Sequence, residues 1–252
     1  MGSGIDRNSP LPYYAQVKEL IHERIRKGDW KTGEQLPGEP ELCRIFEVSR
    51  TVIRQALDSL MREGVIVRIK GRGTFVAEPK ISEGLVQTLT GFYEDMVRQG
   101  YVPVSKVLKQ EVVPASSKIA RYLETNEGAP VIEICRLRYV QEIPLALVTT
   151  YVPQALCPSV LYADLTRQSL YTYLEKTCEL RIARGRRIIE AVLANQYEAQ
   201  LLEIPRDSPL ILLDSVSYLE DDTPIEYYHA LHRSDRARFE VELVRVRDHG
   251  IH

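Results

Sequence analysis

The sequence is poor in cysteine and contains no long hydrophobic run. Of its 252 residues only 4 are cysteines, and they lie far apart with no CxxC pair: Cys43, Cys135, Cys157 and Cys178. This spacing argues against a disulfide framework or a zinc site and favours reduced thiols. No apolar run approaches the roughly 20 residues that span a bilayer, and Met1–Gly4 has neither the basic start nor the apolar stretch of a secretory signal. We therefore expect a cytoplasmic protein without a membrane partner.

The sequence also lacks the motifs of common catalytic and metal sites. Its 5 histidines show no metal-ligand spacing. The chain contains no nucleophile elbow and no carboxylate pair at a catalytic spacing. We therefore predict no catalytic residues, no metal and no cofactor.

The small net charge of −2 hides an uneven distribution along the chain. Residues 1–80 carry 14 Lys and Arg against 11 Asp and Glu, whereas residues 81–252 carry 19 against 24. The first third is therefore net +3 and the remainder net −5. Any surface that binds phosphate groups of a nucleic acid is expected in the first third.

Apolar residues in the first eighty positions predict three short helices and a hairpin. Residues 12–27 have apolar side chains at helical spacing, and a second helix follows with Pro40 in its first turn. Ser49 is a good N-cap for a third helix, and Gly64 is suited to end it. The apolar residues then alternate around the turn Gly71-Arg72-Gly73, which predicts a β-hairpin with a basic tip. Three helices followed by such a hairpin describe a winged helix-turn-helix.

Polar residues left outside the predicted core point to DNA. Arg50 and Arg54 are four residues apart and share the face of the third helix opposite its apolar stripe. A guanidinium can bind guanine or phosphate, and an amide can reach a base edge. On an isolated helix two arginines would more often form a solvated face, but here they precede a basic hairpin, which favours DNA contact. The candidate DNA-binding residues are Arg50, Thr51, Arg54, Gln55, Lys70, Gly71, Arg72 and Gly73.

Residues 12–77 resemble the DNA-binding domain of the GntR superfamily. The similar segments occur in the family's order and spacing, and they are Gln35–Leu42, Val48–Arg50, Ile53–Leu57, Glu63–Gly64 and Gly71–Val76. The resemblance implies that Arg50, Arg54 and the wing around Arg72 make the DNA contacts.

Beyond this region the sequence predicts a linker over residues 79–84, between a DNA-binding domain (1–78) and a larger domain (85–247). Strand-like runs predominate in the larger domain, so we expect an α+β fold around an antiparallel sheet. The expected strands are Ser105–Val113, Pro130–Val140, Ile143–Val152, Ile182–Ala191, Leu210–Leu219, Ile225–Arg233 and Phe239–Val246. The expected helices are Leu85–Gln99, Ser116–Glu124, Gln168–Thr177 and Gln196–Glu203.

A pattern within this larger domain repeats after 79 residues. Six residues recur as the same type 79 positions later: Ala115, Ala120, Leu123, Glu124, Pro130 and Tyr139 correspond to Ala194, Ala199, Leu202, Glu203, Pro209 and Tyr218. Such a repeat predicts two similar halves that build one sheet, with a cleft suited to a small molecule. In the first copy, one strand face begins with apolar residues and ends with Arg136 and Arg138. The residues alone leave two readings open: a solvated strand end, or contact with an anion.

Residues 85–246 resemble the UTRA effector domain of the HutC branch of this superfamily, whose fold is related to chorismate lyase. The similar segments are Leu89–Met96 with Gly100, Arg136-x-Arg138 with Pro144, Ser169-x-Tyr171, and Glu226 with Arg233-x-Asp235-Arg236. The resemblance implies a phosphate held by the loop at 90–92, the two arginines and two hydroxyls, with Glu226 at the hydroxyl-rich end of the ligand. Val148 stands where amino-sugar-phosphate sensors carry an acid, which implies a different ligand. The implied effector-binding residues are Thr90, Gly91, Phe92, Arg136, Arg138, Ser169, Tyr171, Glu226 and His232.

These observations predict a sequence-specific DNA-binding transcription regulator, a repressor by family precedent. We expect a homodimer on a palindromic DNA operator, released or re-oriented by a small anionic metabolite of the phosphosugar or sugar-acid type. Two alternatives remain. A chorismate-lyase-like enzyme domain fused to a DNA-binding head would need catalytic residues, which the sequence does not display. An architectural DNA binder would bind largely independently of sequence and would not need a large domain with an anion pocket.

Overall fold

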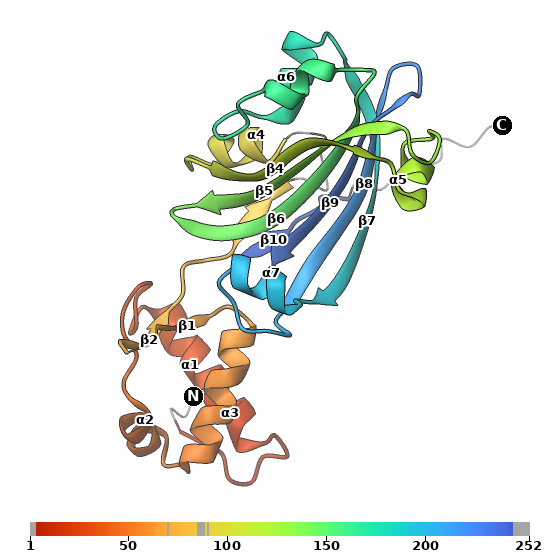
Figure 1. Cartoon of the computed structure of the whole chain (residues 1–252). Coiled ribbons are helices and arrows are strands. Elements are labelled where there is room, and N and C mark those ends of the chain that lie inside the picture. The colour runs from red at the N-terminus through yellow and green to blue at the C-terminus, as the bar shows by residue number, and fades with distance from the viewer. Residues whose placement is uncertain (1–3, 70, 85–88, 90, 244–252) are drawn as a thin grey trace, which may run out of the picture. The chain divides into compact units, whose positions relative to one another are not determined.

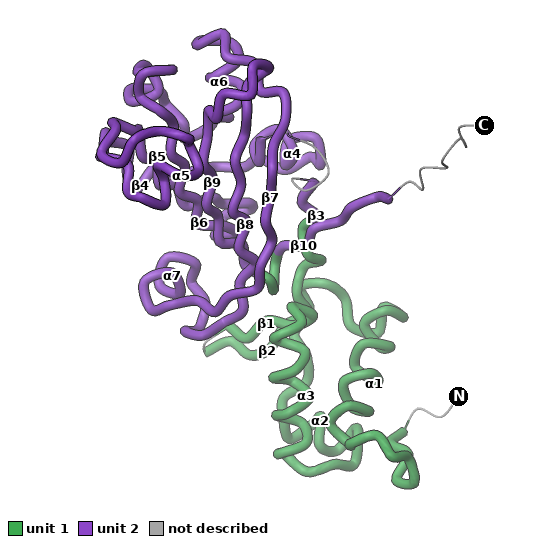
Figure 2. Tube along the Cα trace, turned by 90° about the vertical axis from the view of Figure 1, so that its right-hand side faces the viewer, with its two compact units in different colours: residues 1–81, 234–236 green, residues 82–233, 237–252 purple. Residues whose placement is uncertain are grey.

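The computed structural model describes residues 4–69, 71–84, 89 and 91–243, and it contains two compact units (Figures 1 and 2). Unit 1 comprises residues 1–81 with 234–236, and unit 2 comprises residues 82–233 with 237–252. The expectations for Lys70 and Thr90 fall outside the described residues.

Unit 1 contains the three expected helices, α1 (Tyr13–Lys27), α2 (Glu39–Phe46) and α3 (Arg50–Arg62). The Ser49 hydroxyl accepts a hydrogen bond from the Val52 N–H and so caps α3. Gly64 follows α3 with a φ of 71°, a left-handed conformation that glycine adopts without strain. The predicted start and end of this helix are therefore confirmed.

The helices of unit 1 enclose one apolar core, and a hairpin follows them. Four residues of α3 are at most 1% exposed, and all of them lie on the inner side of the helix: Ile53, Ala56, Leu57 and Leu60. Strands β1 (Ile66–Ile69) and β2 (Gly73–Val76) pair in antiparallel register with Ile69 opposite Gly73. Unit 1 is thus a winged helix-turn-helix, as predicted.

Unit 2 is built on a six-stranded antiparallel sheet with the order β4-β5-β6-β9-β8-β7 (Figure 1). Its strands are β4 (Val104–Pro114), β5 (Pro130–Val140), β6 (Ile143–Pro153), β7 (Ile182–Leu193), β8 (Pro209–Leu219) and β9 (Pro224–Arg233). Each lies within a few residues of an expected strand. The predicted α+β class with an antiparallel sheet is confirmed.

The repeat in the sequence corresponds to a pseudo-two-fold arrangement of this sheet. The first half, β4-β5-β6, and the second half, β7-β8-β9, meet where β6 pairs with β9. The irregularities also match, because the register shifts between Arg138 and Tyr139 in β5 and between Ser217 and Tyr218 in β8. The two halves therefore have the same local structure, as the 79-residue spacing predicted.

Short helices cover both faces of the sheet. Helices α5 (Ser117–Tyr122) and α7 (Gln196–Leu201) pack on one face, in two apolar clusters. The 3-10 helix η2 (Pro158–Tyr162) and α6 (Leu170–Thr177) pack against Ile132 and Ile134. The side chain of Phe92, at the start of α4 (Phe92–Arg98), lies against the Arg138 guanidinium. Ile132, Ile134 and Arg138 are separated by even numbers of residues along β5, so their side chains point to the same face of the sheet. Helices η2, α6 and α4 therefore share this second face.

Two expected elements differ in the structure. Of the C-terminal strand expected at Phe239–Val246, residues 240–243 form no strand and residues 244–246 lie outside the described part. The strand in this region is the short β10 (Ala237–Phe239), which pairs with β3 (Ile81–Glu83). Val241 and Leu243, whose alternation suggested a strand, remain 45% and 88% exposed. Of the helix expected at Leu85–Gln99, the structure contains α4, while residues 85–88 and 90 lie outside the described part.

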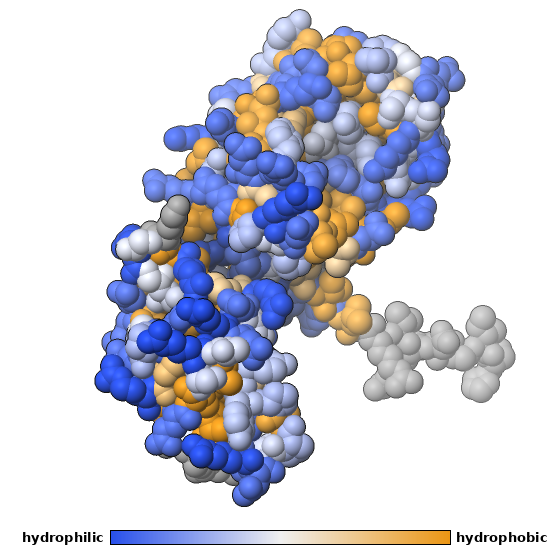
Figure 3. All heavy atoms as spheres, turned by 60° about the horizontal axis from the view of Figure 1, so that its bottom comes forward, coloured by the Kyte–Doolittle hydropathy of each residue, from blue (hydrophilic) through white to orange (hydrophobic). Residues whose placement is uncertain are grey.

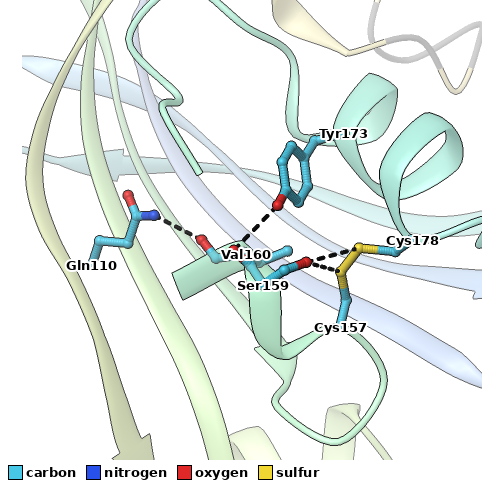
Figure 4. The surroundings of a disulfide bond; sticks show 6 residues. All are labelled: Gln110, Cys157, Ser159, Val160, Tyr173 and Cys178. Carbon is cyan, nitrogen blue, oxygen red and sulfur yellow. Dashed lines mark hydrogen bonds between the residues drawn. A yellow bond between two sulfur atoms is a disulfide. The ribbon is translucent and has the colours of Figure 1, made fainter. Parts of the chain in front are cut away.

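The expectation that all cysteines are reduced is wrong for one pair. Cys157 and Cys178 form a disulfide, with their Cα atoms 6.0 Å apart (Figure 4). Cys157 precedes η2 and Cys178 follows α6, so packing of these two helices in one apolar cluster brings together residues 21 positions apart. The Ser159 hydroxyl lies 3.5 Å and 3.6 Å from the two sulfur atoms. Cys43 and Cys135 are free.

The face of the molecule drawn in Figure 3 is mixed in character, with hydrophilic residues spread over it and smaller apolar patches between them. Among the described residues, no helix combines the length and apolar character needed to cross a membrane.

Candidate DNA-binding surface and effector pocket

Four predicted DNA-binding residues lie together on the outer face of α3. Arg50, Thr51, Arg54 and Gln55 are all exposed, on the side of the helix opposite its buried stripe. The Ser49 cap fixes the start of the helix, so these side chains occupy its first two turns. Two guanidiniums, a hydroxyl and an amide on one exposed helix face can bind phosphates and base edges.

The wing tip is held by a residue to which sequence reasoning gave no role. The Gln35 side chain donates a hydrogen bond to the backbone oxygen of Arg72 at 2.9 Å. Gly73 has a φ of 122°, and a Cβ there would meet the Gln35 Nε2 at 2.5 Å, so glycine is required at this position. Arg72 itself is exposed, with its guanidinium 5.6 Å from the Phe75 ring centre.

An acidic side chain that was not predicted lies next to these cations. Glu39, the first residue of α2, accepts a hydrogen bond from the Arg54 Nε at 2.9 Å. Its other oxygen lies 3.6 Å from an Arg68 nitrogen on β1. The hydrogen bond from Arg54 to Glu39 raises the pKa of the Arg54 guanidinium. Glu39 thus joins the third helix to the wing strand and competes with any phosphate for both cations.

In unit 2, most of the predicted effector-binding residues surround one pocket, whose empty volume of about 460 Å³ includes space open to solvent. The predicted residues in its wall are Gly91, Phe92, Arg136, Arg138, Ser169, Tyr171 and Glu226. The residues that complete the wall and were not predicted are Tyr93, Ser105, Gln168, Leu170, Arg187 and Tyr228.

The arginine pair in this pocket is buried without enough partners. Arg136 is 2% and Arg138 is 7% exposed. Among the described residues, no hydrogen-bond acceptor reaches Nε or Nη2 of Arg136 or Nε of Arg138. Burial, together with repulsion from Arg138, lowers the pKa of Arg136 to about 9. A buried cation with unsatisfied donors is destabilising unless an anion compensates it, so this end of the pocket is suited to an anionic ligand.

A hydrogen-bonded carboxylate also faces the pocket. Glu226 Oε2 accepts hydrogen bonds from the Tyr171 hydroxyl at 2.8 Å and from the Ser217 hydroxyl at 3.1 Å. Burial raises the pKa of the Glu226 carboxyl and raises the pKa of the Tyr171 hydroxyl well above its ordinary value. A carboxylate fixed in this way can accept hydrogen bonds from the hydroxyls of a ligand.

The wall formed by α4 and α6 depends on a close approach at Gly91. A Cβ on Gly91 would lie 2.6 Å from the Ser169 Oγ and 2.5 Å from a Glu94 oxygen. Ser169 is the N-cap of α6, and its hydroxyl accepts from the Thr172 N–H at 3.4 Å. The Thr172 hydroxyl in turn donates to Glu94 of α4. These contacts hold the two helix starts together at the pocket.

His232 lies away from these residues. Its Nδ1 is 2.9 Å from the Glu83 Oε1, both side chains are fully buried, and the Phe239 ring contacts it edge-on. It does not belong to the pocket wall. The structure thus brings together seven of the nine predicted effector residues, places His232 elsewhere, and leaves Thr90 undescribed.

Comparison with known protein families identifies both units. Residues 13–76 match the model of the bacterial regulatory proteins of the gntR family, and residues 98–238 match the model of the UTRA domain. The chain belongs to the GntR family, in its HutC-type group with a UTRA domain. Its relatives of this type are transcription regulators and not enzymes, which favours the regulator reading over the enzyme alternative.

Characterised relatives resemble this GntR regulator over nearly its whole length. It is 32% identical to the HTH-type transcriptional repressor NagR of Bacillus subtilis over 93% of this chain and 96% of NagR. It is 32% identical to the histidine utilization repressor of Pseudomonas putida, over 95% of this chain and 93% of that repressor. Among solved structures, PhnF of Mycobacterium smegmatis has a TM-score of 0.64 at 28% identity, covering 92% of this chain and 99% of PhnF.

Proposed function

We propose that this GntR regulator is a repressor whose homodimer binds a palindromic operator and is released by a small anionic metabolite bound in the UTRA pocket. Residues 1–78 bind DNA and residues 85–247 bind the effector, joined by residues 79–84. Two winged domains related by a two-fold axis fit two half-sites about one helical turn apart. The protein acts in the cytoplasm, where its operator lies.

The observation that carries the effector proposal is the pair of buried arginines with unsatisfied donors. Arg136 and Arg138 present at least three guanidinium nitrogens without partners among the described residues. A phosphate or carboxylate supplies oxygen acceptors and negative charge in the geometry that guanidinium groups bind best. Relatives named for sugar-derived compounds, such as the mannosyl-D-glycerate transport/metabolism system repressor MngR of Escherichia coli, support a phosphosugar or sugar acid.

Helix α4 supplies a route from the pocket to the segment that follows the DNA-binding unit. Gly91 and Phe92, at its start, lie in the pocket wall. One turn further along, Asp95 Oδ2 accepts a hydrogen bond from the Gly84 N–H at 2.7 Å. After its last turn, the Gln99 side chain donates to the Ser82 carbonyl oxygen at 2.7 Å. A ligand that shifts α4 therefore shifts residues 82–84, and coupling requires that the ligand bind the two positions of α4 with different affinity.

Arg136→Ala in the full-length protein tests the proposal. A panel of phosphosugars and sugar acids is screened by thermal shift, and each compound that stabilises the wild type is added to operator-bound protein. We expect Arg136→Ala to bind the operator like the wild type but to lose both stabilisation and release by the compound. Arg206→Ala, in an exposed turn of the same unit, is the matched control. A normal response of Arg136→Ala would show that the effector binds elsewhere.

A further inference from the structure

A third arginine enters the effector pocket from the opposite edge of the sheet. Arg187 lies on β7, opposite Ser215 of β8, and its Nε donates to the Ser215 hydroxyl at 2.6 Å. It is half-buried and belongs to the pocket wall. The neighbouring arginines of β7 do not belong to this pocket. The Arg184 Nε lies 2.6 Å from the Asp222 Oδ1, and Arg186 lines a different surface hollow together with Val216. Of these three arginines, the register of β7 places only Arg187 in the pocket wall.

The two groups of cations enter the pocket from different strands of the sheet. Arg136 and Arg138 lie on β5, and β6, β9 and β8 separate that strand from β7. Four steps between neighbouring strands correspond to about 19 Å between the backbones of β5 and β7. The long side chains reach inward from both sides, since the guanidinium carbons of Arg138 and Arg187 lie 6.0 Å and 5.8 Å from the centre of the Tyr228 ring. Tyr228 is on β9, midway between them.

Arg187 offers donors to a ligand from a different strand than Arg136 and Arg138. Glu226 is the carboxylate in the pocket wall, and it is already bound by Tyr171 and Ser217. Within the described chain, no carboxylate forms an ion pair with Arg187, whose observed hydrogen bond is the one to Ser215. Because Ser215 occupies its Nε, the two Nη groups remain as a fork that matches one carboxylate. Arg136 and Arg138 together offer more donors, which match the three oxygens of a phosphate.

From this arrangement we infer that the effector carries two anionic groups, a phosphate bound by Arg136 and Arg138 and a carboxylate bound by Arg187. The chain between them carries hydroxyls that face Glu226 and the unpartnered Tyr228 hydroxyl. A phosphorylated sugar acid has this chemistry, whereas an ordinary sugar phosphate lacks the second charge. The inference rests on the proposed function, because it assumes that the effector occupies this pocket.

Matched pairs of compounds test the second anionic group. Each pair has the same carbon chain and the same phosphate but differs in a terminal carboxylate or hydroxymethyl group: 6-phosphogluconate with glucitol 6-phosphate, and 3-phosphoglycerate with glycerol 3-phosphate. Affinities are measured by titration calorimetry on the full-length wild type, Arg187→Gln and Arg186→Gln. We expect the acid of at least one pair to bind the wild type about tenfold more tightly or better. Arg187→Gln should remove this preference without weakening the polyol phosphate, and Arg186→Gln should keep it.

Other outcomes separate this inference from the proposed function. Equal affinity of the acid and the polyol in both pairs, or equal weakening of both by Arg187→Gln, would overturn the carboxylate site and leave the phosphate site intact. Binding of no compound in either pair would also overturn it. Inorganic phosphate then decides the proposed function independently, because its binding needs only Arg136 and Arg138. Arg187→Lys, which keeps the charge but loses the fork, should retain part of the preference.

Discussion

The imidazole Nδ1 of His232 lies 2.9 Å from the Oε1 of Glu83, and neither side chain is exposed to solvent. Glu83 belongs to the short strand β3 that follows the DNA-binding unit, and His232 belongs to the central strand β9. The second oxygen of Glu83 and the Nε2 of His232 have no partner among the described residues. The pair therefore fastens β3 to the sheet, and removal of one member leaves the other without compensation.

His232→Ala should destabilise the protein strongly. It removes the partner of a fully buried carboxylate, and breaking such a pair typically costs about 3–5 kcal/mol. The free energy of unfolding from denaturant titrations measures the loss.

The double variant Glu83→Leu with His232→Leu is the control, because it removes both polar groups and should recover most of the stability. If His232→Ala unfolded like the wild type but lost effector affinity, the histidine would instead be the ligand residue that the family resemblance implies.

Arg136→Met should stabilise the ligand-free protein while it abolishes anion binding. The substitution removes a buried guanidinium that lacks partners and is repelled by Arg138, and methionine keeps much of the side-chain volume. We expect the free energy of unfolding to rise by about 1–3 kcal/mol. A lower stability of Arg136→Met in denaturant titrations would show that the arginine is compensated in the free protein.

Glu226 should make the stability of the protein depend on pH. Burial raises the pKa of its carboxyl above the value in the unfolded chain, against the opposing effect of the Tyr171 and Ser217 hydrogen bonds. The group therefore favours folding below its unfolded pKa, and this contribution is lost as the pH rises through the folded pKa.

Comparison with Glu226→Gln isolates this contribution. The free energy of unfolding of the wild type minus that of the variant should decrease as the pH rises above the ordinary pKa of a glutamate, about 4.3. A difference that is constant, or that increases with pH, would contradict the assignment.

Glu39→Gln should increase the affinity of the protein for DNA of any sequence. The change releases Arg54 and Arg68 from an ion pair and removes a negative charge close to the phosphates. Binding to random duplexes, followed by fluorescence anisotropy over a salt series, should show tighter binding and a steeper salt dependence. Glu41→Gln removes a charge from the exposed side of the same helix without releasing an arginine, so it is the control. Equal effects of the two variants would mean that net charge alone matters.

Asp95→Asn should separate effector binding from release of DNA. The two Asp95 oxygens bind the Gly84 N–H and the Arg98 guanidinium, and an amide has only one acceptor oxygen for these two donors. Effector affinity should change by less than about twofold, while effector-induced dissociation of the operator should weaken. Arg98→Ala removes one donor and keeps the Gly84 contact, so it should respond like the wild type. Loss of effector binding in Asp95→Asn would place this residue in the binding site itself.

Local sequence signals predicted those elements whose ends carry specific residues. Strand β5 was expected at Pro130–Val140 and lies there, because proline and the following turn mark its ends. Helix α3 begins after Ser49 and ends before Gly64 for similar reasons. The repeat of one pattern at a 79-residue interval predicted the pseudo-two-fold sheet.

Features that depend on packing between distant segments could not be predicted in this way. The Cys157–Cys178 disulfide exists because η2 and α6 share one apolar cluster, which the spacing of the cysteines does not reveal. Arg187 enters the pocket because the register of β7 turns it, and not Arg186, toward the site. The pairing of His232 with Glu83 joins positions 149 residues apart. Alternation alone suggested a strand at Val241 and Leu243, but in the described part of the chain these two side chains stay 45% and 88% exposed.

The central claim is that an anion in the UTRA pocket and the operator are coupled through one protein. Calorimetric titration of an anion identified by the pocket screen, with and without saturating operator DNA, tests it most directly. Linkage requires that the operator weaken the binding of the anion by the same factor by which the anion weakens the binding of the operator. We predict equal factors of about 5 to 150 in the wild type, and no measurable binding of the anion to Arg136→Ala with or without operator. Anion affinity that is the same with and without operator would contradict the account.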